Sequence, residues 1–338
     1  MNRNSDGLNG FVIRPVALDD VDSVVDLINA VAIKETGMAA TGREDQLIEW
    51  GLPQFNIETD TQMVLTTEGR LAGFVQLWDS EPHVRYYLFG RVHPDYRHRG
   101  VGRSLVEWAE ARAWQSVPLA PPEARVSIHT NAVHENEAAH QLFRAQGYRP
   151  TRSFYRMVID MEPSAPPPEP VWPDGIRARP YRLGEEDRAV HATLQEAFRD
   201  HWGVVEGESF EEWFHWIEED EKFDPSVCFL AVAGADEIAG VLMARPEWEG
   251  DPNFAWIDEL GVLRPWRQRG IGLALLHQSF AAFHRRGRYR VGLGVDGESL
   301  TGALHLYEKA GMRIFQQRDA YEKVLRPGVD LSTQAVEE

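Results

Sequence analysis

Hydrophobic and polar residues follow one another along this chain in a pattern that occurs twice. Residues 11–15 are a short, mostly apolar run that predicts a strand, and residues 21–28 then carry apolar side chains at helical spacing. Residues 176–182 and 185–198 repeat this order. The two copies lie much further apart than solenoid repeats, whose period is about 20 to 50 residues. The pattern therefore predicts a duplicated domain.

The remainder of each copy predicts the same series of elements, namely a hairpin, a strand, a long helix, a strand, a short helix and a closing strand. In the first copy these elements are expected at 63–66, 71–77, 84–92, 101–113, 125–129, 136–146 and 153–161. In the second copy they are expected at 227–232, 238–244, 254–262, 271–283, 290–295, 300–310 and 317–325. Each copy is predicted to be an α/β domain of the mixed α+β kind, with a mostly antiparallel sheet flanked by helices.

Proline content and the loss of periodicity predict the domain boundaries. Residues 163–175 contain too many prolines for a helix or a central strand, so a stiff, extended linker is expected there. Residues 327–338 have no periodicity and are expected to form a flexible tail. The predicted domains are residues 9–162 and 176–326.

Composition narrows the class of protein. Of the 338 residues, 43% are hydrophobic and 26% are charged, as in a globular protein. The formal net charge of −18 argues against a nucleic-acid partner, because most of the surface would repel phosphates. Residues 1–10 lack the apolar stretch of a signal peptide, and no apolar run reaches membrane-spanning length. A cytoplasmic protein without membrane contact is expected.

Cysteine and histidine do not predict a metal site. Cys228 is the only cysteine and lies in an apolar run, which favours a buried core thiol over a nucleophile. The histidines show no metal-ligand spacing such as HExxH. We therefore expect no metal ion.

The stretch from 260 to 276 combines a strand, a basic turn and a helix that opens with glycine. The strand is expected to end near Val262, and the Gly-x-Gly sequence at 270–272 opens a helix whose first N–H groups have no intrahelical acceptor. Those donors and the positive end of the helix dipole favour a diphosphate. Glycine lets the backbone approach the phosphates closely, and Arg267 and Arg269 add positive charge.

The same sequence device occurs in the first copy, at 92–105. Arg97, Arg99, Gly100 and Gly102 have the spacing found in the second copy. A single turn of this kind is weak evidence. Two of them, each between an apolar strand and a long amphipathic helix, are much stronger.

On these two turns the chain resembles the GCN5-related N-acetyltransferase (GNAT) family, and specifically its tandem two-domain members. In that family the segment (Arg/Gln)-x-x-Gly-x-(Gly/Ala) holds the pyrophosphate of acetyl-CoA, and both turns match it in full. The resemblance covers nearly the whole chain. It implies two tandem GNAT-type domains and acetyl-CoA as the acyl donor.

The resemblance also implies which residues bind the coenzyme. The strand before each turn is implied to pair with the pantetheine arm, and an asparagine often precedes the late helix; Asn136 keeps that asparagine, whereas the second copy has Ser299. The coenzyme-binding residues implied in the second copy are Val262, Leu263, Arg267, Gln268, Arg269, Gly270, Ile271, Gly272, Leu273, Ala274 and Ser299. Those implied in the first copy are Val92, Arg97, His98, Arg99, Gly100, Val101, Gly102, Arg103, Ser104 and Asn136.

A tyrosine in the late helix is implied to be the acid that protonates the leaving thiolate. Tyr307 occupies this position in the second copy, shortly before Gly311, whereas the first copy has Phe143, which has no proton to give. A phenol with a pKa of about 10 is protonated at neutral pH and is reasonably matched to a thiolate. The alternative is that Tyr307 is a packed aromatic side chain.

Two adjacent carboxylates are the candidates for the base. Asp258 and Glu259 lie in the strand before the second turn, and alternation sends them to opposite faces of the sheet. Glu259 is slightly preferred, although a bulge expected near the coenzyme makes that parity uncertain. An ordinary solvated carboxylate is the alternative. The first copy has no carboxylate at residues 86–91.

The first copy thus lacks both the tyrosine and the carboxylates of the second copy. These two differences predict that the C-terminal copy catalyses and that the N-terminal copy is chemically weak or inert, while its intact turn remains able to hold acetyl-CoA. The predicted activity is transfer of an acetyl group to a small-molecule amine by direct attack, in a monomer or a homodimer. The alternatives are acetylation of a cysteinyl amine, since residues 294–312 also resemble mycothiol synthases, and a non-catalytic acyl-CoA sensor. The aromatic residues Trp202, Trp213, Phe214 and Trp216 favour core packing over an apolar acceptor pocket.

Overall fold

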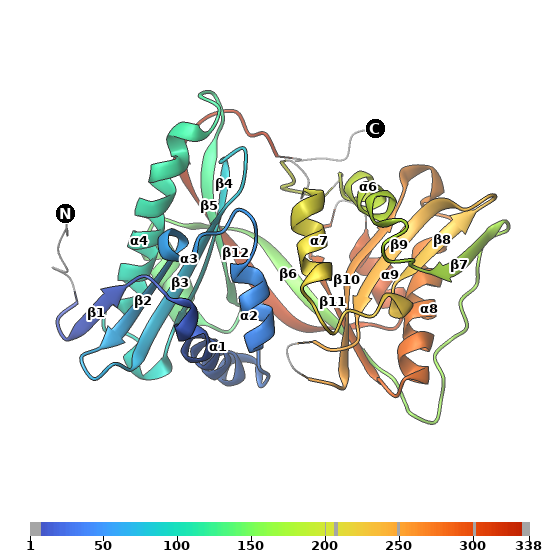
Figure 1. Ribbon diagram of the computed structural model, residues 1–338, viewed down its shortest axis with the longest axis horizontal. Coiled ribbons are helices and arrows are strands. Elements are labelled where there is room, and N and C mark those ends of the chain that lie inside the picture. The colour runs from blue at the N-terminus through green and yellow to red at the C-terminus, as the bar shows by residue number, and fades with distance from the viewer. Residues whose placement is uncertain (1–7, 200, 206–208, 249–250, 300–301, 333–338) are drawn as a thin grey trace. The chain divides into compact units, whose positions relative to one another are not determined.

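The computed structural model describes residues 8–199, 201–205, 209–248, 251–299 and 302–332. The chain forms two compact units (Figure 1). The first contains the described residues up to Arg152 together with Arg318–Leu331, and the second contains Ser153–Gln317.

The first unit is built on a mixed sheet in which only one pair of neighbouring strands is parallel. The strand order is β1 (Phe11–Arg14), β2 (Thr61–Thr66), β3 (Leu71–Asp79), β4 (Arg85–Val92), β5 (Val126–Val133) and β12 (Arg313–Arg326). The parallel pair is β4 with β5, and the others that bear on the site are antiparallel.

Helices cover both faces of this sheet (Figure 1). The helices are α1 (Val21–Thr36), α2 (Arg43–Trp50), α3 (Ile57–Asp60), α4 (Val101–Ser116) and α5 (Glu137–Ala145). The buried residues of α1, spaced three and four apart, pack against Phe74 of β3. A Cβ on the neighbouring Gly73 would lie 2.6 Å from Val101 and 2.9 Å from Leu105 of α4. Because adjacent strand residues point to opposite faces, α1 and α4 lie on opposite sides of the sheet.

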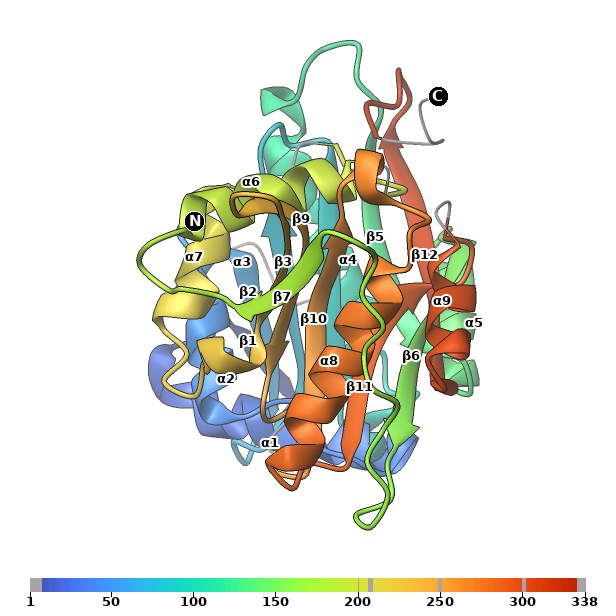
Figure 2. The ribbon, with the colours of Figure 1, turned by 90° about the vertical axis from the view of Figure 1, so that its right-hand side faces the viewer.

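The second unit repeats this arrangement. Its strand order is β7 (Ile176–Pro180), β8 (Phe229–Ala233), β9 (Glu237–Arg245), β10 (Phe254–Val262), β11 (Arg290–Asp296) and β6 (Arg149–Asp160), with β10 parallel to β11. Its helices are α6 (Asp187–Phe198), α7 (Phe210–Glu218), α8 (Ile271–Arg285) and α9 (Ala303–Lys309). Helix α8 covers one face of the sheet (Figure 2), and α6 and α7 pack on the other face through Leu194, Trp213 and Met243.

Each closing strand belongs to the sheet of the other copy, which differs from the predicted domain ranges. Residues 154–160 of β6 pair with β11 in the second unit, and residues 318–326 of β12 pair with β5 in the first. The predicted ranges 9–162 and 176–326 kept each closing strand with its own copy. Alternation of apolar and polar residues predicts a strand but not the sheet edge that it joins.

The predicted linker and tail are both anchored in their described parts. Trp172, within residues 163–175, packs against the core of the second unit. Val329 donates its N–H to the carbonyl of Glu123 and accepts from the N–H of Arg125, both at 2.8 Å. Residues 327–331 are therefore held by the first unit rather than forming a flexible tail. The end of that predicted tail, 333–338, lies outside the described residues.

Two further expectations are confirmed. The fold is a mixed, mostly antiparallel α/β architecture with helices on both faces, present twice. Cys228 is fully buried, and burial raises the pKa of its thiol to about 12, as suits a core residue.

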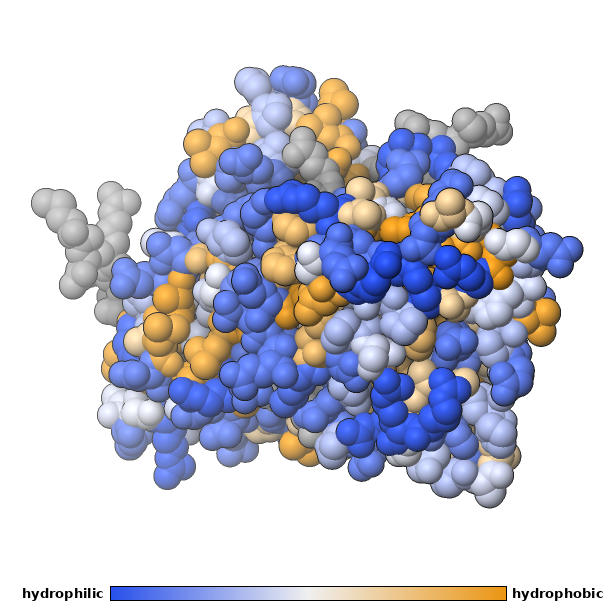
Figure 3. Space-filling model, turned by 45° about the vertical axis from the view of Figure 1, so that its right-hand side comes forward, coloured by the Kyte–Doolittle hydropathy of each residue, from blue (hydrophilic) through white to orange (hydrophobic). Residues whose placement is uncertain are grey.

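Within the described residues, no helix is long and apolar enough to cross a membrane. Hydrophilic residues cover most of the face seen in Figure 3, and apolar residues occur there in scattered groups.

Candidate active site and coenzyme cradles

Each unit contains the same glycine-opened turn, with the same backbone conformation. In the second unit, Gln268 has φ +61° and Gly270 has φ +87° at the position directly before α8. In the first unit, His98 has φ +61° and Gly100 has φ +85° directly before α4. We name residues 97–103 the first cradle and residues 267–273 the second cradle. Glycine is required at the second of these left-handed positions because it adopts that conformation without strain.

The backbone amides at the start of α4 and α8 are available to a ligand. The first bonds that close these helices run from Ser104 N to Gly100 O and from Ala274 N to Gly270 O, each 3.0 Å long. No side chain of the described residues caps either helix, and no backbone acceptor there receives the N–H groups of 101–103 or 271–273. Three free donors and the helix dipole make each cradle suitable for a diphosphate.

The space beside the glycines supports this interpretation. Gly270 is exposed, and a Cβ built on it would meet no atom within 4 Å. A Cβ on Gly272 would lie 3.1 Å from Leu306 of α9, and one on Gly102 would lie 3.1 Å from Leu142 of α5. The first glycine of each pair is therefore required by the turn, and the second by the close approach of two helices.

The second arginine of each cradle lies over an aromatic ring. The guanidinium of Arg269 lies 4.9 Å from the ring centroid of Trp266, and that of Arg99 lies 5.7 Å from the ring centroid of Tyr96. Such cation–π contacts hold a positive charge at the cradle without neutralising it.

The first arginine of each cradle is held in a different way in the two units. Arg267 donates to the carbonyl oxygens of Val262 at 3.0 Å and Ala197 at 2.9 Å. Arg97 instead donates from Nη2 to Oε1 of Glu35, at 2.7 Å, and forms an ion pair with it. Arg97 therefore has a carboxylate partner, whereas two of the partners of Arg267 are backbone carbonyl groups.

Asn136 and Ser299 are not structural equivalents. Asn136 caps α5 by accepting from Ala139 N at 3.0 Å, and its Nδ2 donates to Glu35 Oε1 at 2.7 Å. In the second unit Gly302 precedes α9, and Ser299 lies upstream in a turn in which its carbonyl accepts from Gly302 N. Ser299 therefore lies upstream of the helix cap, which is Gly302 in the second unit and Asn136 in the first.

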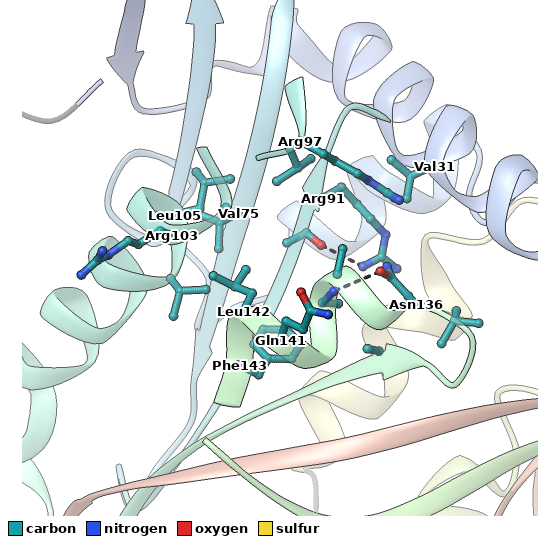
Figure 4. A pocket seen from close by; sticks show the side chains of 18 of the residues that line it. Val31, Val75, Arg91, Arg97, Arg103, Leu105, Asn136, Gln141, Leu142 and Phe143 are labelled. Carbon is teal, nitrogen blue, oxygen red and sulfur yellow. Dashed lines mark hydrogen bonds between the residues drawn. The ribbon is translucent and has the colours of Figure 1, made fainter. Parts of the chain in front are cut away.

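In the first unit, the parallel strands separate beside the cradle and leave a cavity. β4 and β5 pair only from Arg85 to Tyr87. The cavity, of about 410 Å³, opens beyond that point between Gly90–Val92, residues 131–133, α4 and α5. Figure 4 shows Arg91, Arg97 and Asn136 on one side of the cavity and Val75 and Leu105 on the other. Cationic and amide groups beside apolar walls suit an anionic coenzyme with a long, flexible arm.

In the second unit, the parallel strands separate at a bulge. β10 pairs with β11 from Phe254 to Ile257, and the register of β10 against β9 then shifts between Ile257 and Glu259. Asp258 is the extra residue, which is the bulge expected near the coenzyme. The β3–β4 pair of the first unit keeps one register from Gly73 to Asp79. A bulge redirects side chains and ends pairing. In the described residues, β10 carries a bulge before its cradle, and β4 does not.

The two candidate bases have different partners. Asp258 is paired with Arg245 at 3.0 Å, and 27% of its side chain is exposed. The surrounding protein shields Asp258 from water and raises its pKa, and Arg245 opposes that change. Glu259 accepts a hydrogen bond of 3.1 Å from Nε1 of Trp213 on α7. Asp258 is therefore ion-paired with Arg245, and the partners of Glu259 include the neutral indole N–H of Trp213.

Tyr307 and Phe143 occupy corresponding places in the late helices. The carbonyl of each accepts a hydrogen bond from a residue just beyond the helix, Met312 N for Tyr307 and Tyr148 N for Phe143. Tyr307 is 8% exposed, and burial raises its pKa to about 12. Phe143 lines the cavity of the first unit. A proton donor is thus present at this position in the second unit only.

Several residues of these sites were not found from the sequence. Glu35 comes from α1 and meets the first cradle from a distant part of the chain. Arg91 lines the cavity although it lies outside the glycine turn. Trp213 was predicted to be a core residue; it is buried in the core and also bonds Glu259. No local pattern marks the contacts of Glu35 and Trp213, because each joins residues far apart in sequence.

Comparison with known proteins agrees with the fold. Residues 188–312 match the acetyltransferase (GNAT) family, and residues 58–150 match the acetyltransferase (GNAT) domain. The mycothiol acetyltransferase of Salinispora arenicola is 32% identical over 269 residues, which cover 77% of this chain and 80% of that protein. The chain belongs to the GCN5-related N-acetyltransferase family, as two tandem domains, and its activity is N-acetylation with acetyl-CoA as acyl donor.

Solved structures show the same architecture. The GCN5-related N-acetyltransferase of Sphaerobacter thermophilus is 32% identical and superposes with a TM-score of 0.79, covering 96% of this chain and 98% of that protein. A tandem GNAT protein from the clavulanic acid biosynthesis pathway has a TM-score of 0.69 at 17% identity, covering 94% of this chain and all of that protein. The second likeness concerns the fold alone.

Proposed function

We propose that acetyl transfer takes place in the second unit, with Glu259 as the base and Tyr307 as the acid. The observation that carries this proposal is the bulge at Asp258, where β10 leaves β11. In the part of the chain that the structure describes, the pairing of β10 with β11 ends at Ile257, and we propose that N–H groups further along β10 stabilise the developing oxyanion. Glu259 lies just beyond the end of that pairing.

The proposed reaction is a direct displacement. The amine nitrogen attacks the thioester carbonyl carbon, the C–S bond breaks, and an amide bond forms. Glu259 takes the proton of the attacking amine, directly or through water, and Tyr307 gives its proton to the departing sulfur. Because the pKa of Tyr307 is about 12, the phenol keeps its proton throughout the neutral range.

We propose that the first cradle holds acyl-CoA without reacting. Its amides, Arg97 and the cavity suit the coenzyme, whereas Phe143 cannot donate a proton. Phe89 and its neighbours on β4 supply no carboxylate. Calorimetric titration with acetyl-CoA is expected to give two sites per chain. If the wild type shows a single site, and a variant of the second cradle loses that site, this part of the proposal is wrong.

For the acceptor, we propose a cysteinyl amine attached to a pseudodisaccharide, as in mycothiol acetylation. The proposal rests on the relative from Salinispora arenicola, which is similar over most of both chains. A small, neutral or cationic acceptor also agrees with the net charge of −18, which disfavours nucleic acid.

The acceptor is tested by incubating the protein and acetyl-CoA with the cysteinyl pseudodisaccharide, S-methyl-L-cysteinamide, glucosamine or lysinamide. Products are measured by mass, because the first acceptor has its own thiol. The proposal predicts N-acetylation of the pseudodisaccharide with the highest kcat/KM and slower reaction of S-methyl-L-cysteinamide. Preference for glucosamine or lysinamide would contradict it.

A further inference from the structure

Trp213 is a buried residue whose polar atom reaches the proposed reaction centre. It lies on α7, faces the sheet and is 5% exposed. Its Nε1–H donates to Oε2 of Glu259 over 3.1 Å. A buried indole N–H needs a partner, and here that partner is the proposed base.

The surroundings of Trp213 fix its ring. His191 of α6 lies 5.5 Å from it, centroid to centroid, and Phe210 lies at 6.1 Å. Helix α7 begins with a capping box, in which Ser209 Oγ accepts from Glu212 N and Glu212 Oε2 accepts from Ser209 N. The packed ring and the capped helix hold the N–H in one direction.

A neutral donor suits a general base better than a cation does. The pairing of Asp258 with Arg245 neutralises that carboxylate. The indole N–H of Trp213 favours the ionised form of Glu259 and fixes its orientation, while it leaves the negative charge available to a proton.

The first unit contains a matched contact that has no carboxylate. Trp50 of α2 is also 5% exposed, and its Nε1–H donates to Oε1 of Gln76 over 3.0 Å. Gln76 lies on β3, is 1% exposed and cannot act as a base at neutral pH. A tryptophan on the second helix of each unit therefore satisfies its N–H on the sheet, but only Trp213 does so with a carboxylate.

We propose that Trp213 is the positioning residue for the base, holding the Glu259 carboxylate at the opening between β10 and β11. This inference rests on the proposed role of Glu259. Trp213 touches neither substrate and acts only through Glu259.

Other charged or titratable groups near this contact bear on any pH profile. Asp258 and Arg245 lie on β10 and β9, Asp220 adds negative charge near Asp258, and His191 packs against the Trp213 ring. Cys228 lies in the same buried cluster as Trp213 and, with a pKa of about 12, remains neutral. Because all of these groups are unchanged in a Trp213 variant, a change in the profile reports on the Glu259 contact.

The test compares Trp213→Phe with Trp50→Phe, which removes an indole N–H from an equally buried tryptophan of the first unit, with a hydrogen bond of 3.0 Å against 3.1 Å. Acetyl transfer to S-methyl-L-cysteinamide is measured from pH 5.5 to 9. We expect Trp213→Phe to lower kcat about tenfold and to move the acid limb of kcat/KM about 0.5 to 1 unit to higher pH, since a donor to the anion is lost. The KM for acetyl-CoA is expected to stay unchanged, and Trp50→Phe is expected to behave as wild type.

A second readout does not depend on the acceptor. In protein with ¹³C-labelled glutamate carboxyls, the signal missing from Glu259→Gln identifies Glu259. Its titration midpoint is expected to move to higher pH in Trp213→Phe and to stay in place in Trp50→Phe. An unchanged midpoint and an unchanged acid limb in Trp213→Phe would overturn the inference. If Glu259→Gln keeps wild-type turnover, the proposed base is wrong, whatever the Trp213 variant does.

Discussion

The carboxylate of Glu35 accepts two hydrogen bonds on one oxygen, from Arg97 and from Asn136, each 2.7 Å long. Both donors belong to the proposed coenzyme-binding set of the first unit. A negative charge therefore lies within the cradle that is proposed to hold a diphosphate. The corresponding arginine of the second cradle, Arg267, bonds to neutral carbonyl groups.

We predict that Glu35→Gln tightens acetyl-CoA binding at the first cradle. The glutamine oxygen can still accept from both donors, so the geometry is kept while one negative charge is removed. The dissociation constant of that site is expected to fall roughly three- to tenfold, by an amount that decreases with salt. Calorimetric titration at two salt concentrations measures it. Weaker binding in Glu35→Gln would show that the charge is not what limits affinity.

The left-handed glycines offer a matched pair of variants. Gly270→Ala and Gly100→Ala each place a side chain at φ close to +86°, where an L-residue costs about 1–2 kcal/mol. Each variant is expected to distort the amides of its own cradle. Gly270→Ala should raise the KM for acetyl-CoA about tenfold or more. Gly100→Ala should weaken acetyl-CoA binding at one of the two sites seen by calorimetry and leave the KM for acetyl-CoA within about twofold of wild type. A raised KM in both variants would indicate that the cradles are not independent.

The adjacent carboxylates should respond differently to neutralisation. We expect Glu259→Gln to lower kcat by about 10²-fold or more, the usual range for loss of a general base. Asp258→Asn, which leaves Arg245 without its ion-pair partner, should lower kcat less than about tenfold. Steady-state kinetics at pH 7.5 provide the comparison, with circular dichroism to confirm folding. The reverse order would assign the base to Asp258.

Glu49 of α2 makes stability depend on pH. Burial raises the pKa of Glu49 to about 7, and hydrogen bonds from Gln76 and Gln46 oppose that change. Since the folded pKa lies above the unfolded value, the folded state binds the proton more tightly, and this stabilisation is present below about pH 4.5 and is lost as pH rises through 7. The wild type is expected to lose on the order of 2 kcal/mol of its free energy of unfolding between pH 5 and 8, and Glu49→Gln should remove that loss.

Urea unfolding at those two pH values measures the effect. The control is Glu58→Gln, which changes an exposed carboxylate of α3 and should keep the pH dependence of the wild type. If Glu49→Gln and Glu58→Gln show the same dependence, burial of Glu49 is not its source.

The sequence was sufficient for the elements that local chemistry determines. Helices α4 and α8 begin where the glycine turns predicted, because Gly100 and Gly270 adopt left-handed dihedrals that end one element and start the next. The strands next to these turns also lie close to their predicted positions. The bulge at Asp258 was expected, but its absence from β4 was not, because no residue type marks that difference.

The contacts that complete the sites depend on distant parts of the chain. The closing strands β6 and β12 have similar alternation, so the pattern did not determine which sheet each one joins. Glu35 reaches Arg97 only because α1 ends beside the first cradle. The spacing of Trp213 correctly placed it in the core, but periodicity describes a face of a helix and not the partner of a single N–H group.

The most direct test of the account compares the two late helices, because it asks which unit carries the chemistry. Turnover of acetyl-CoA with S-methyl-L-cysteinamide is measured for Tyr307→Phe and for Phe143→Leu. We predict that Tyr307→Phe lowers kcat about 10²-fold or more while acetyl-CoA binding is retained, and that Phe143→Leu stays within about threefold of wild type. Loss of turnover in Phe143→Leu, with wild-type turnover in Tyr307→Phe, would contradict the assignment of catalysis to the second unit.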